Sequence, residues 1–350
     1  MSNTRVCSSF HGGQLKNIRI CDAFGAPCEM VFIPRFLLSD VIEGADALPH
    51  PAFVRDGKLL DGIYVSKYQN VVENGVAYSL PNRDPAVCID YDEAHAACAK
   101  KGAGWHMMTA EEWGAIALLC QYNRFLPHGN NDGGKDVRES AYLARVTYRD
   151  EDKGAVRTAT GTGPCEWFHD RTPKGIADLN GNVWEWMNGI RLVFGELQIF
   201  SGGAWRALSA ENAAAIVPDG NGTTPNSLKL DFLDDRWVWT KNPICDMLAK
   251  PRHCAFSRVC ADNSVGRGAQ QYLWALGCLP FDPAEDYGGV SFYANNGKPE
   301  RMLFRGGRYG QGYDAGIFKS CFDDPRTAKG EMIGFRAVYH QIKKDFGEQS

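Results

Sequence analysis

Four stretches of the chain carry the apolar patterns of short β-strands. Residues 29–34 form an apolar run that a proline ends, and residues 61–68 alternate apolar with polar side chains. A third strand is predicted from Val183, where aromatic residues follow the tight turn that Asn180-Gly181 marks. The fourth stretch, residues 196–206, is a strand with a Gly-Gly break in it.

Two helices are predicted between the second and the third strand. Small and apolar residues repeat at helical spacing across residues 90–101, and Gly102 is expected to end that helix. The second helix begins at Thr109, because Thr109 and Glu112 have the spacing of a capping box. In a capping box each of these side chains accepts a hydrogen bond from a backbone N–H that the helix leaves free.

Two long segments show neither a helical period nor a strand alternation. Residues 123–175 are rich in Gly, Asn, Asp and Arg, which predicts loops. Residues 208–300 contain Pro, Asn and Asp beside several large aromatic residues, and we interpret them as a long connection.

The stretch from Leu303 to Val338 combines a frame of glycines with an unusual choice of side chains. Glycines at Gly307, Gly312 and Gly316 permit tight turns and close approach of strands. Aromatic and Arg side chains supply much contact energy for little lost entropy, so we expect one contiguous, solvent-exposed binding face. An ordinary surface loop over a core edge is the alternative that composition leaves open. The residues of the expected face are Arg308, Tyr309, Tyr313, Asp314, Phe318, Cys321, Asp323, Asp324 and Arg326.

Composition and charge narrow the class of protein. A chain of 350 residues with 44% hydrophobic residues can bury a large core, and we expect a single domain over residues 1–350. The net charge is −4 and the pI is near 6.1, without a long Lys/Arg cluster, so nucleic acid is not an expected partner. No apolar window is long enough to span a membrane, and the N-terminus lacks the apolar core of a signal peptide. We therefore expect no membrane insertion, a monomer, and a virion-associated or cytoplasmic location.

The twelve cysteines are scattered and form no Cys-x-x-Cys pair, which disfavours a zinc ribbon. Reduced thiols are expected, since several cysteines stand in apolar helical surroundings. The spacing of Cys254 and Cys260 leaves a disulfide bond between them open.

The segment 303–338 resembles the variable region of diversity-generating retroelement variable proteins. It reproduces their Arg-Gly-Gly, Gly-rich middle and terminal Gly-Phe-Arg. In that family, adenine-directed mutagenesis frees the first two bases of Asn-type codons, which then cannot encode Trp, Gln, Lys, Met or Glu. Every residue of the expected face is reachable in this way. Gln311 and Lys319 are not, so they are either fixed positions or evidence against the assignment.

The resemblance implies a non-enzymatic, receptor-like or adhesin-like protein whose C-terminal surface is diversified to bind varied targets. The ligand would be an unknown protein or cell-surface molecule. The ligand-binding residues on this hypothesis are Arg308, Tyr309, Gln311, Tyr313, Asp314, Phe318, Cys321, Asp323, Asp324 and Arg326.

Over most of its length the chain also resembles the formylglycine-generating-enzyme branch of the C-type lectin fold. This resemblance implies an α+β domain of short, irregular strands with two main helices, in which the N- and C-terminal strands lie close together. Residues 208–300 would be an insertion ahead of the variable region 303–338. The matching landmarks are Met30-Val31-Phe32-Ile33-Pro34, the helix before Gly102, Thr109-Ala-Glu-Glu-Trp113, Gly181-Asn-Val-Trp-Glu-Trp186, Arg305-Gly-Gly307 and Gly334-Phe-Arg336.

Formylglycine-generating enzymes bind copper with a cysteine pair, and the corresponding positions here are Gln311 and Gly316. Neither can supply the thiolate that Cu(I) requires, so no catalytic residue and no cofactor is expected. The alternative is a formylglycine-generating-like oxidase or sulfatase-modifying-factor homologue that has lost its cysteine pair. Glu185, between two tryptophans, is expected to be a structural carboxylate paired with an Arg or with backbone donors.

A calcium-dependent sugar lectin is disfavoured, because the chain lacks its carboxylate and amide triplets. No metal is therefore expected. A structural calcium ion is left open at Asn130, Asn131 and Asp132, or at Asp178 and Asn180, although such residues are common in turns for geometric reasons.

Overall fold

The computed structural model describes residues 17–341, except residues 142, 151–153, 155 and 245–249. The expectation about a signal peptide falls on residues 1–16, which lie outside the described residues, as do Cys7 and Cys245. The ten described cysteines are all free thiols, including Cys254 and Cys260, which confirms the expectation of reduced cysteines for these ten. No helix in the described part of the chain is both long and apolar enough to cross a membrane.

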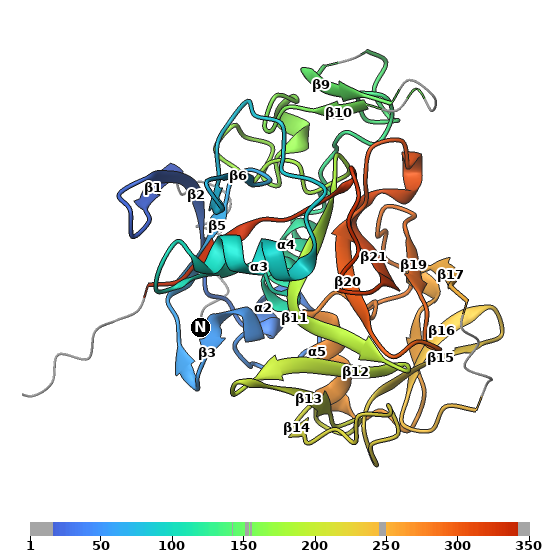
Figure 1. Ribbon diagram of the computed structural model, residues 1–350. Helices are drawn as coiled ribbons and strands as arrows, with labels where there is room; N and C mark the ends of the chain where they lie inside the picture. The colour runs from blue at the N-terminus through green and yellow to red at the C-terminus, as the bar shows by residue number, and fades with distance from the viewer. Residues whose placement is uncertain (1–16, 142, 151–153, 155, 245–249, 342–350) are drawn as a thin grey trace, which may run out of the picture.

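A five-stranded antiparallel sheet brings the two ends of the described chain together. Its order is β1-β2-β5-β23-β8, so the last strand of the chain lies between two early ones, as the resemblance implied. In Figure 1 this sheet lies on the left, where the blue β1 and β2 approach the red C-terminal segment. Its strands are β1 (Asn17–Cys21), β2 (Pro27–Pro34), β5 (Gly62–Ser66), β8 (Trp105–Met107) and β23 (Ala337–Tyr339).

A larger, twelve-stranded sheet fills the other side of the molecule (Figure 1). Its main path is β17-β19-β21-β20-β11-β12-β15-β16-β18, and β13, β14 and β22 pair beside this path. The strands are β11 (Trp184–Val193), β12 (Glu196–Ser201), β13 (Ala204–Leu208), β14 (Ala215–Ile216), β15 (Lys229–Leu233), β16 (Arg236–Thr240), β17 (Arg252–Ala255), β18 (Cys260–Ala261), β19 (Ser291–Ala294), β20 (Arg301–Gly306), β21 (Gly316–Asp324) and β22 (Ile333–Gly334).

Three separate two-stranded hairpins complete the β structure. Only short elements occur in the described part of residues 123–175, which confirms that this segment consists mostly of loops. The hairpins are β3 (Val54–Arg55) with β4 (Lys58–Leu59), β6 (Val71–Glu73) with β7 (Val76–Tyr78), and β9 (Val146–Arg149) with β10 (Val156–Thr158).

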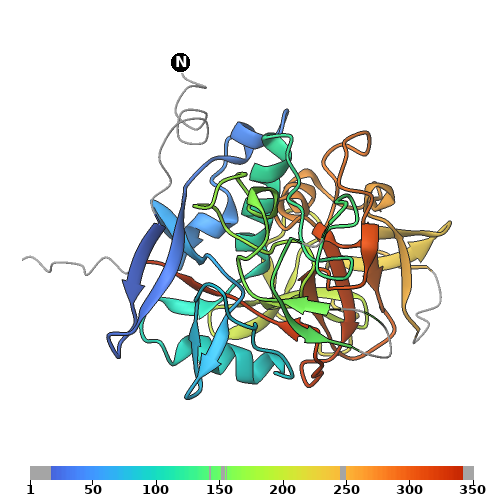
Figure 2. The ribbon, with the colours of Figure 1, turned by 90° about the horizontal axis from the view of Figure 1, so that it is seen from above.

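Both predicted helices are present, and both begin with a capping box. In α3 (Tyr91–Ala99) the box joins Asp90 and Glu93, and in α4 (Ala110–Tyr122) it joins Thr109 and Glu112. Helix α4 is buried along nearly its whole length and lies between the two sheets, as Figures 1 and 2 show. The remaining helical elements are α2 (Leu38–Val41), α5 (Arg267–Ala275) and the 3₁₀ turns η1 (Pro51–Phe53), η2 (Cys165–Trp167), η3 (Phe256–Arg258) and η4 (Gly312–Asp314).

The expectation that residues 208–300 form an irregular connection is wrong. This segment supplies β14 to β19 and α5, a helix of nine residues that the sequence pattern does not predict, and its strands belong to the larger sheet. The chain turns between β15 and β16 at Asp234 and Asp235, both of which have positive φ. This turn is short, so the sequence shows only a brief break between the two strands. That this segment is an insertion relative to other proteins remains a prediction.

A buried ion pair joins the two sheets. The Arg336 guanidinium donates to both carboxylate oxygens of Glu185, over 2.6 and 2.7 Å, and both side chains are almost completely shielded from solvent. Arg336 also donates to the backbone carbonyls of Ser66 and Ala177, each over 3.1 Å. The expectation that Glu185 is a structural carboxylate paired with an arginine is confirmed.

The side-chain amide of Gln69 lies next to this ion pair. Its nitrogen is 3.1 to 3.5 Å from the carbonyl oxygens of Asp178, Gly181 and Val183, and 3.2 Å from the Glu185 carboxylate. One amide nitrogen thus faces four oxygens that come from a single turn and the strand after it. These contacts fix the backbone of the turn from residue 178 to residue 183, which leads into β11 of the larger sheet.

We expect Arg336→Met to lower the free energy of unfolding by about 3–5 kcal/mol, because it leaves the buried Glu185 carboxylate without its partner. Urea denaturation followed by tryptophan fluorescence measures this change. Arg19→Met is the matched control, since Arg19 pairs with Glu29 on the surface over 3.1 Å. It should cost less than about 1 kcal/mol, and similar losses for both variants would mean that the buried pair has no special role.

Candidate functional site

The loop between β20 and β21 forms the centre of the predicted binding region. The two strands pair with Gly306 opposite Gly316, and residues 307–315 connect them. Gly307 has a φ of 81°, and a Cβ atom at this position would lie 2.7 Å from the Cβ atom of Ala315. The closure of the loop therefore requires glycine at residue 307.

Three polar side chains hold this loop in shape. The Gln311 carboxamide oxygen accepts a hydrogen bond from the backbone N–H of Arg308, over 3.1 Å. The Asp314 carboxylate accepts from the backbone N–H of Ser291 over 2.7 Å and from the Lys319 ammonium group over 2.5 Å, and Lys319 also donates to the Ser291 hydroxyl. Burial lowers the pKa of the Lys319 amino group, and the Asp314 carboxylate offsets part of that shift.

The expectation of an exposed face is wrong for Tyr309, Phe318 and Cys321, whose side chains are buried. Phe318 packs against the rings of Phe256 and Tyr287, with centroid distances of 5.5 and 4.9 Å. The cause is the position of Phe318 and Cys321 within β21, which is an interior strand of the sheet and is covered on both faces.

Asp323, Asp324 and Arg326 lie at the far end of β21 from the loop. Nine residues of strand span about 30 Å, so these side chains cannot share one patch with the loop. Arg326 is engaged there by the carboxylates of Glu300 and Asp92, over 3.2 and 3.3 Å. The expectation of one contiguous face is therefore wrong, because the candidate residues divide between the two ends of a buried strand.

The solvent-facing part of the predicted site is the loop itself. Tyr313 is 67% exposed, and Arg308, Gln311 and Asp314 are half-buried. Arg308 donates from its guanidinium only to the adjacent Tyr309 carbonyl among the described residues, over 3.1 Å. Tyr313 and Arg308 are thus the two loop side chains with the most freedom to contact a ligand.

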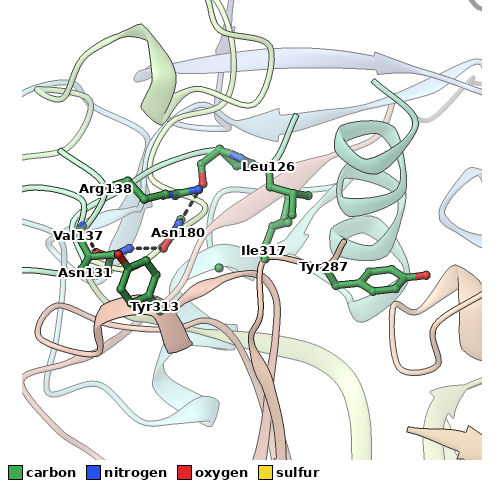
Figure 3. A pocket seen from close by; sticks show the side chains of 12 residues that line it. Leu126, Asn131, Val137, Arg138, Asn180, Tyr287, Tyr313 and Ile317 are labelled. Carbon is green, nitrogen blue, oxygen red and sulfur yellow. Dashed lines mark hydrogen bonds between the residues drawn. The ribbon is translucent and has the colours of Figure 1, made fainter. Parts of the chain in front are cut away.

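A small cavity of about 50 Å³ opens beside this loop (Figure 3). Tyr313 covers one side of it, and Asn131 and Asn180 face it from two other loops. A space of this size accepts a few heavy atoms at most, such as the end of one side chain. The remaining lining is mainly apolar and comes from Leu126, Pro127, Val137, Arg138, Tyr287, Gly288, Ala315, Gly316 and Ile317.

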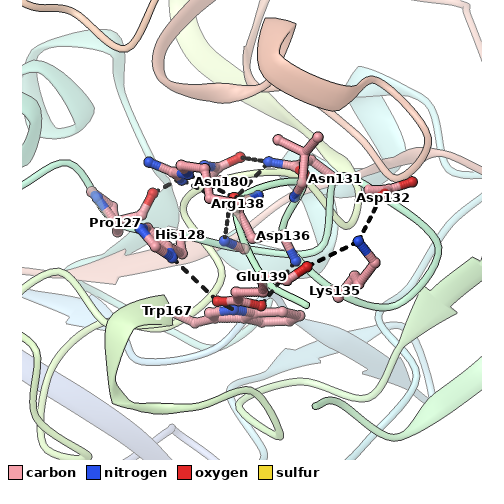
Figure 4. Close-up of polar contacts among 12 residues, drawn as sticks. Pro127, His128, Asn131, Asp132, Lys135, Asp136, Arg138, Glu139, Trp167 and Asn180 are labelled. Atoms are coloured by element: carbon pink, nitrogen blue, oxygen red, sulfur yellow. Dashed lines mark hydrogen bonds and ion pairs between the residues drawn. The ribbon is translucent and has the colours of Figure 1, made fainter. Parts of the chain in front are cut away.

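A dense set of hydrogen bonds fixes the far wall of the cavity (Figure 4). The Asp136 carboxylate accepts from the backbone N–H of Gly129, from the Asn131 amide and, at both oxygens, from the Arg138 guanidinium. Burial opposes ionisation of Asp136, but the hydrogen bonds from Arg138 and the backbone outweigh it and hold the pKa of Asp136 below its ordinary value. Trp167 supports this wall from below through a 3.0 Å hydrogen bond to Glu139.

The oxygens at which the sequence left a calcium site open are used within the protein. Asn130 donates to the Val156 carbonyl, and its side-chain oxygen accepts from Gly134. Asp132 pairs with Lys135 over 2.9 Å. Within the described ranges, no group of three or more His, Cys, Asp or Glu side chains is arranged to hold a metal ion.

The site does not fit the copper centre of formylglycine-generating enzymes. Gln311 offers an amide that already braces the loop, and Gly316 has no side chain. Cys321 is the cysteine nearest in the chain, but burial raises the pKa of its thiol to about 12, so it stays protonated at neutral pH. A soft Cu(I) ion therefore finds no thiolate pair at these positions.

The family model of the sulfatase-modifying factor enzyme 1-like domain matches residues 49–228, which is more than half of the chain. The chain belongs to this family. The matched range includes both capped helices and Gly181-Asn-Val-Trp-Glu-Trp186, the motif that holds Glu185. The expected fold class is therefore confirmed as an α+β fold with short strands and few helices, of the formylglycine-generating-enzyme-like type.

Two curated relatives of this sulfatase-modifying factor enzyme 1-like protein are inactive C-alpha-formylglycine-generating enzyme 2 from Bos taurus and from Mus musculus. Each is 27% identical over 146 residues, which is 41% of this chain and 46% or 45% of the relative. The chain thus matches slightly less than half the length of these relatives.

Two solved structures show more distant similarity. PvdO from Pseudomonas aeruginosa is 14% identical, with a TM-score of 0.32, over 93% of this chain and 98% of its own. The Major Tropism Determinant U1 variant is 10% identical, with a TM-score of 0.31, over 90% of this chain and 65% of its own. Such TM-scores leave the arrangement of the elements free to differ.

The residues that build the cavity wall opposite the loop are not predicted from the sequence. The sequence pattern points to Asn131 only as a calcium ligand, and it does not indicate Arg138. The signal was the concentration of Asn, Asp and Arg in residues 123–175, which composition alone cannot distinguish from an ordinary loop.

Lys319→Met should lower the free energy of unfolding by roughly 1.5–3 kcal/mol, because hydrogen bonds to charged groups contribute about that much. Tyr313→Ala is the control on the exposed side of the same loop, and it should stay within about 0.5 kcal/mol of the unchanged protein. Equilibrium unfolding in urea compares the two. An equal loss for both would show that Tyr313 also supports the loop.

Proposed function

We propose that this protein is a non-catalytic ligand-binding protein whose β20–β21 loop is diversified by a retroelement. The observation that carries the proposal is a division of roles between side chains in the loop and at the start of β21. Adenine-directed mutagenesis cannot produce codons for Gln311 or Lys319. Gln311 accepts a hydrogen bond from the loop backbone, and Lys319 donates one to the Asp314 carboxylate, so both hold the loop in shape. Mutagenesis of this kind can encode Tyr313, which is 67% exposed, and Arg308, which is half-buried and whose guanidinium donates only to the Tyr309 carbonyl among the described residues.

The proposed contact surface is smaller than the one expected from sequence. It consists of Arg308 and Tyr313 together with the neighbouring wall of the cavity, where Val137 and Arg138 lie. Tyr309, Phe318 and Cys321 are excluded because they are buried, and the residues beyond β21 because they lie at its other end. A rigid tyrosine beside a small apolar cavity suits contact with a protein surface, since aromatic anchors lose little entropy on binding.

Two observations support the absence of catalysis. The positions of the copper-binding cysteine pair hold Gln311 and Gly316, which leaves no redox-active thiolate at the loop. The curated relatives are themselves named inactive formylglycine-generating enzymes. A homologue that has merely lost its cysteine pair, without diversification, is the second candidate, and the DNA beside the gene distinguishes the two.

For the remaining properties we propose a monomer that binds an unknown protein or cell-surface ligand. A virion-associated or cytoplasmic location is proposed as well. Nucleic acid is not proposed as a partner, because the net charge is −4.

The first test is the sequence of the flanking DNA. The proposal expects a near-identical copy of the segment that encodes residues 303–338, differing only at adenines, beside a reverse-transcriptase gene. Substitutions should fall on the codons of Arg308 and Tyr313 and spare those of Gln311 and Lys319. A flank without any such copy would leave the undiversified homologue as the better description.

The second test is a pair of surface-displayed libraries selected against lysozyme as the probe. One library randomises Arg308, Tyr313 and Val137, and the matched control randomises the buried Tyr309, Phe318 and Cys321. Most members of the first library should resist protease, because surface changes cost little stability, and selection should enrich lysozyme binders from it. Equal protease resistance in the two libraries would contradict the proposed division between framework and contact surface.

A further inference from the structure

A second cleft, of about 510 Å³, lies on a different part of the molecule. It shares no lining residue with the cavity beside the β20–β21 loop. The β3–β4 hairpin and the tip of the β12–β13 hairpin border it, and α3, β8 and the first turn of α4 form its floor. Its volume falls in the range of small-molecule sites, which is about 300–1,000 Å³.

Exposed apolar side chains gather at the edges of this cleft. Phe200 on the β12–β13 side is 53% exposed, and Val54 on the β3–β4 side is 44% exposed. The Phe200 ring packs edge-on against Trp205 with a centroid distance of 5.6 Å, which holds it in place beside the opening. Such a concentration of exposed apolar groups around one hollow marks a binding surface.

The cleft lining contains no excess of positively charged side chains over carboxylates. The Nε2 atom of His106 lies 2.7 Å from the Glu112 carboxylate, and its Nδ1 atom lies 3.3 Å from the Gly104 carbonyl oxygen, so both ring nitrogens are engaged within the protein. Glu112 is thus engaged by His106, and Glu111 accepts a hydrogen bond from the Tyr272 hydroxyl over 2.6 Å.

The remaining charged residues in the lining are Arg55 and Asp56, which are adjacent in the chain and opposite in sign. No unmatched positive charge is therefore present to hold an anion. A neutral ligand fits these charges better than an anionic one.

The imidazole ring of His340 gives the floor of the cleft its hydrogen-bonding capacity. The ring lies beside that of His106, with a centroid distance of 5.3 Å, and has no hydrogen-bond partner among the described residues. Burial, followed by the nearby His106 and Arg55, lowers the pKa of His340 to about 4, so the ring is neutral at pH 7. A neutral imidazole has one nitrogen with a free lone pair, which can accept a hydrogen bond from a ligand.

We propose that this cleft binds a small, neutral, planar aromatic molecule with an N–H or O–H donor, which the free ring nitrogen of His340 accepts. Phe200 and Val54 contact the ring of the ligand from opposite edges of the cleft. This site is independent of the proposed ligand-binding loop, so the failure of one proposal leaves the other standing.

Ligand-observed NMR titration tests the proposal with indole and 1-methylindole as probes on the full chain. The two molecules differ in the N–H donor and a methyl group. Indole should bind saturably, and 1-methylindole about tenfold more weakly, which corresponds to about 1.4 kcal/mol for the lost hydrogen bond. The absence of saturable indole binding would overturn the proposal.

Three variants separate the contributions to binding. His340→Phe keeps an aromatic ring but has no acceptor, so indole and 1-methylindole should bind equally. Phe200→Ala, at an exposed position where folding is not at risk, should weaken both probes by a similar factor. Val217→Ala is the matched control, because Val217 is 71% exposed and lies outside the cleft lining. A retained preference for indole in His340→Phe, or equal losses in Phe200→Ala and Val217→Ala, would overturn the proposal.

Discussion

The structure depends on the buried contact between Arg336 and Glu185. Arg336 directly precedes the last strand of the small sheet, and Glu185 lies in β11 of the large one. Because a charge inside a protein is tolerated only with a partner, the ion pair forces the two sheets into one relative position. The Gln69 amide, next to the ion pair, donates to carbonyls of the turn at residues 178–183. The Arg336 guanidinium also donates to the carbonyls of Ser66 and Ala177.

That fixed centre is also the base of the candidate site. β11 pairs with β20, and the site loop leaves the sheet at the end of β20. On the first side of the loop, the buried Arg305 guanidinium donates to the Gly277 carbonyl over 3.0 Å. On the other side, the Trp113 indole of α4 donates to the Ile317 carbonyl over 2.7 Å. A loop anchored at both ends in this way can change its exposed side chains without losing its backbone path, because its stability resides in groups that those side chains do not touch.

The parts of the structure that sequence analysis predicted are those that local chemistry determines. The spacing of Thr109 and Glu112 is enough to predict the start of a helix. Glu185 stands between two tryptophans, and a buried carboxylate needs a partner inside the protein, which predicts its ion pair. Family resemblance supplied the order of these landmarks and placed β23 beside the N-terminal strands. The loop at Gly307 was also predicted, since glycines at close spacing indicate tight closure.

Two predictions are wrong for the same reason: Phe318 was expected to be exposed, and helix α5 was not expected at all. Both depend on how residues 208–300 fold. Burial of Phe318 is produced by Phe256 and Tyr287, which belong to that segment and contact β21 only in the folded chain. The residue type alone does not show whether an aromatic side chain of β21 is buried or lies on the surface. The answer depends on how the segment that covers it folds. The fold of residues 208–300 therefore determines which residues of β21 are accessible to solvent. It turns β21 into an interior strand and leaves the loop before it as the place where side chains can change at low cost.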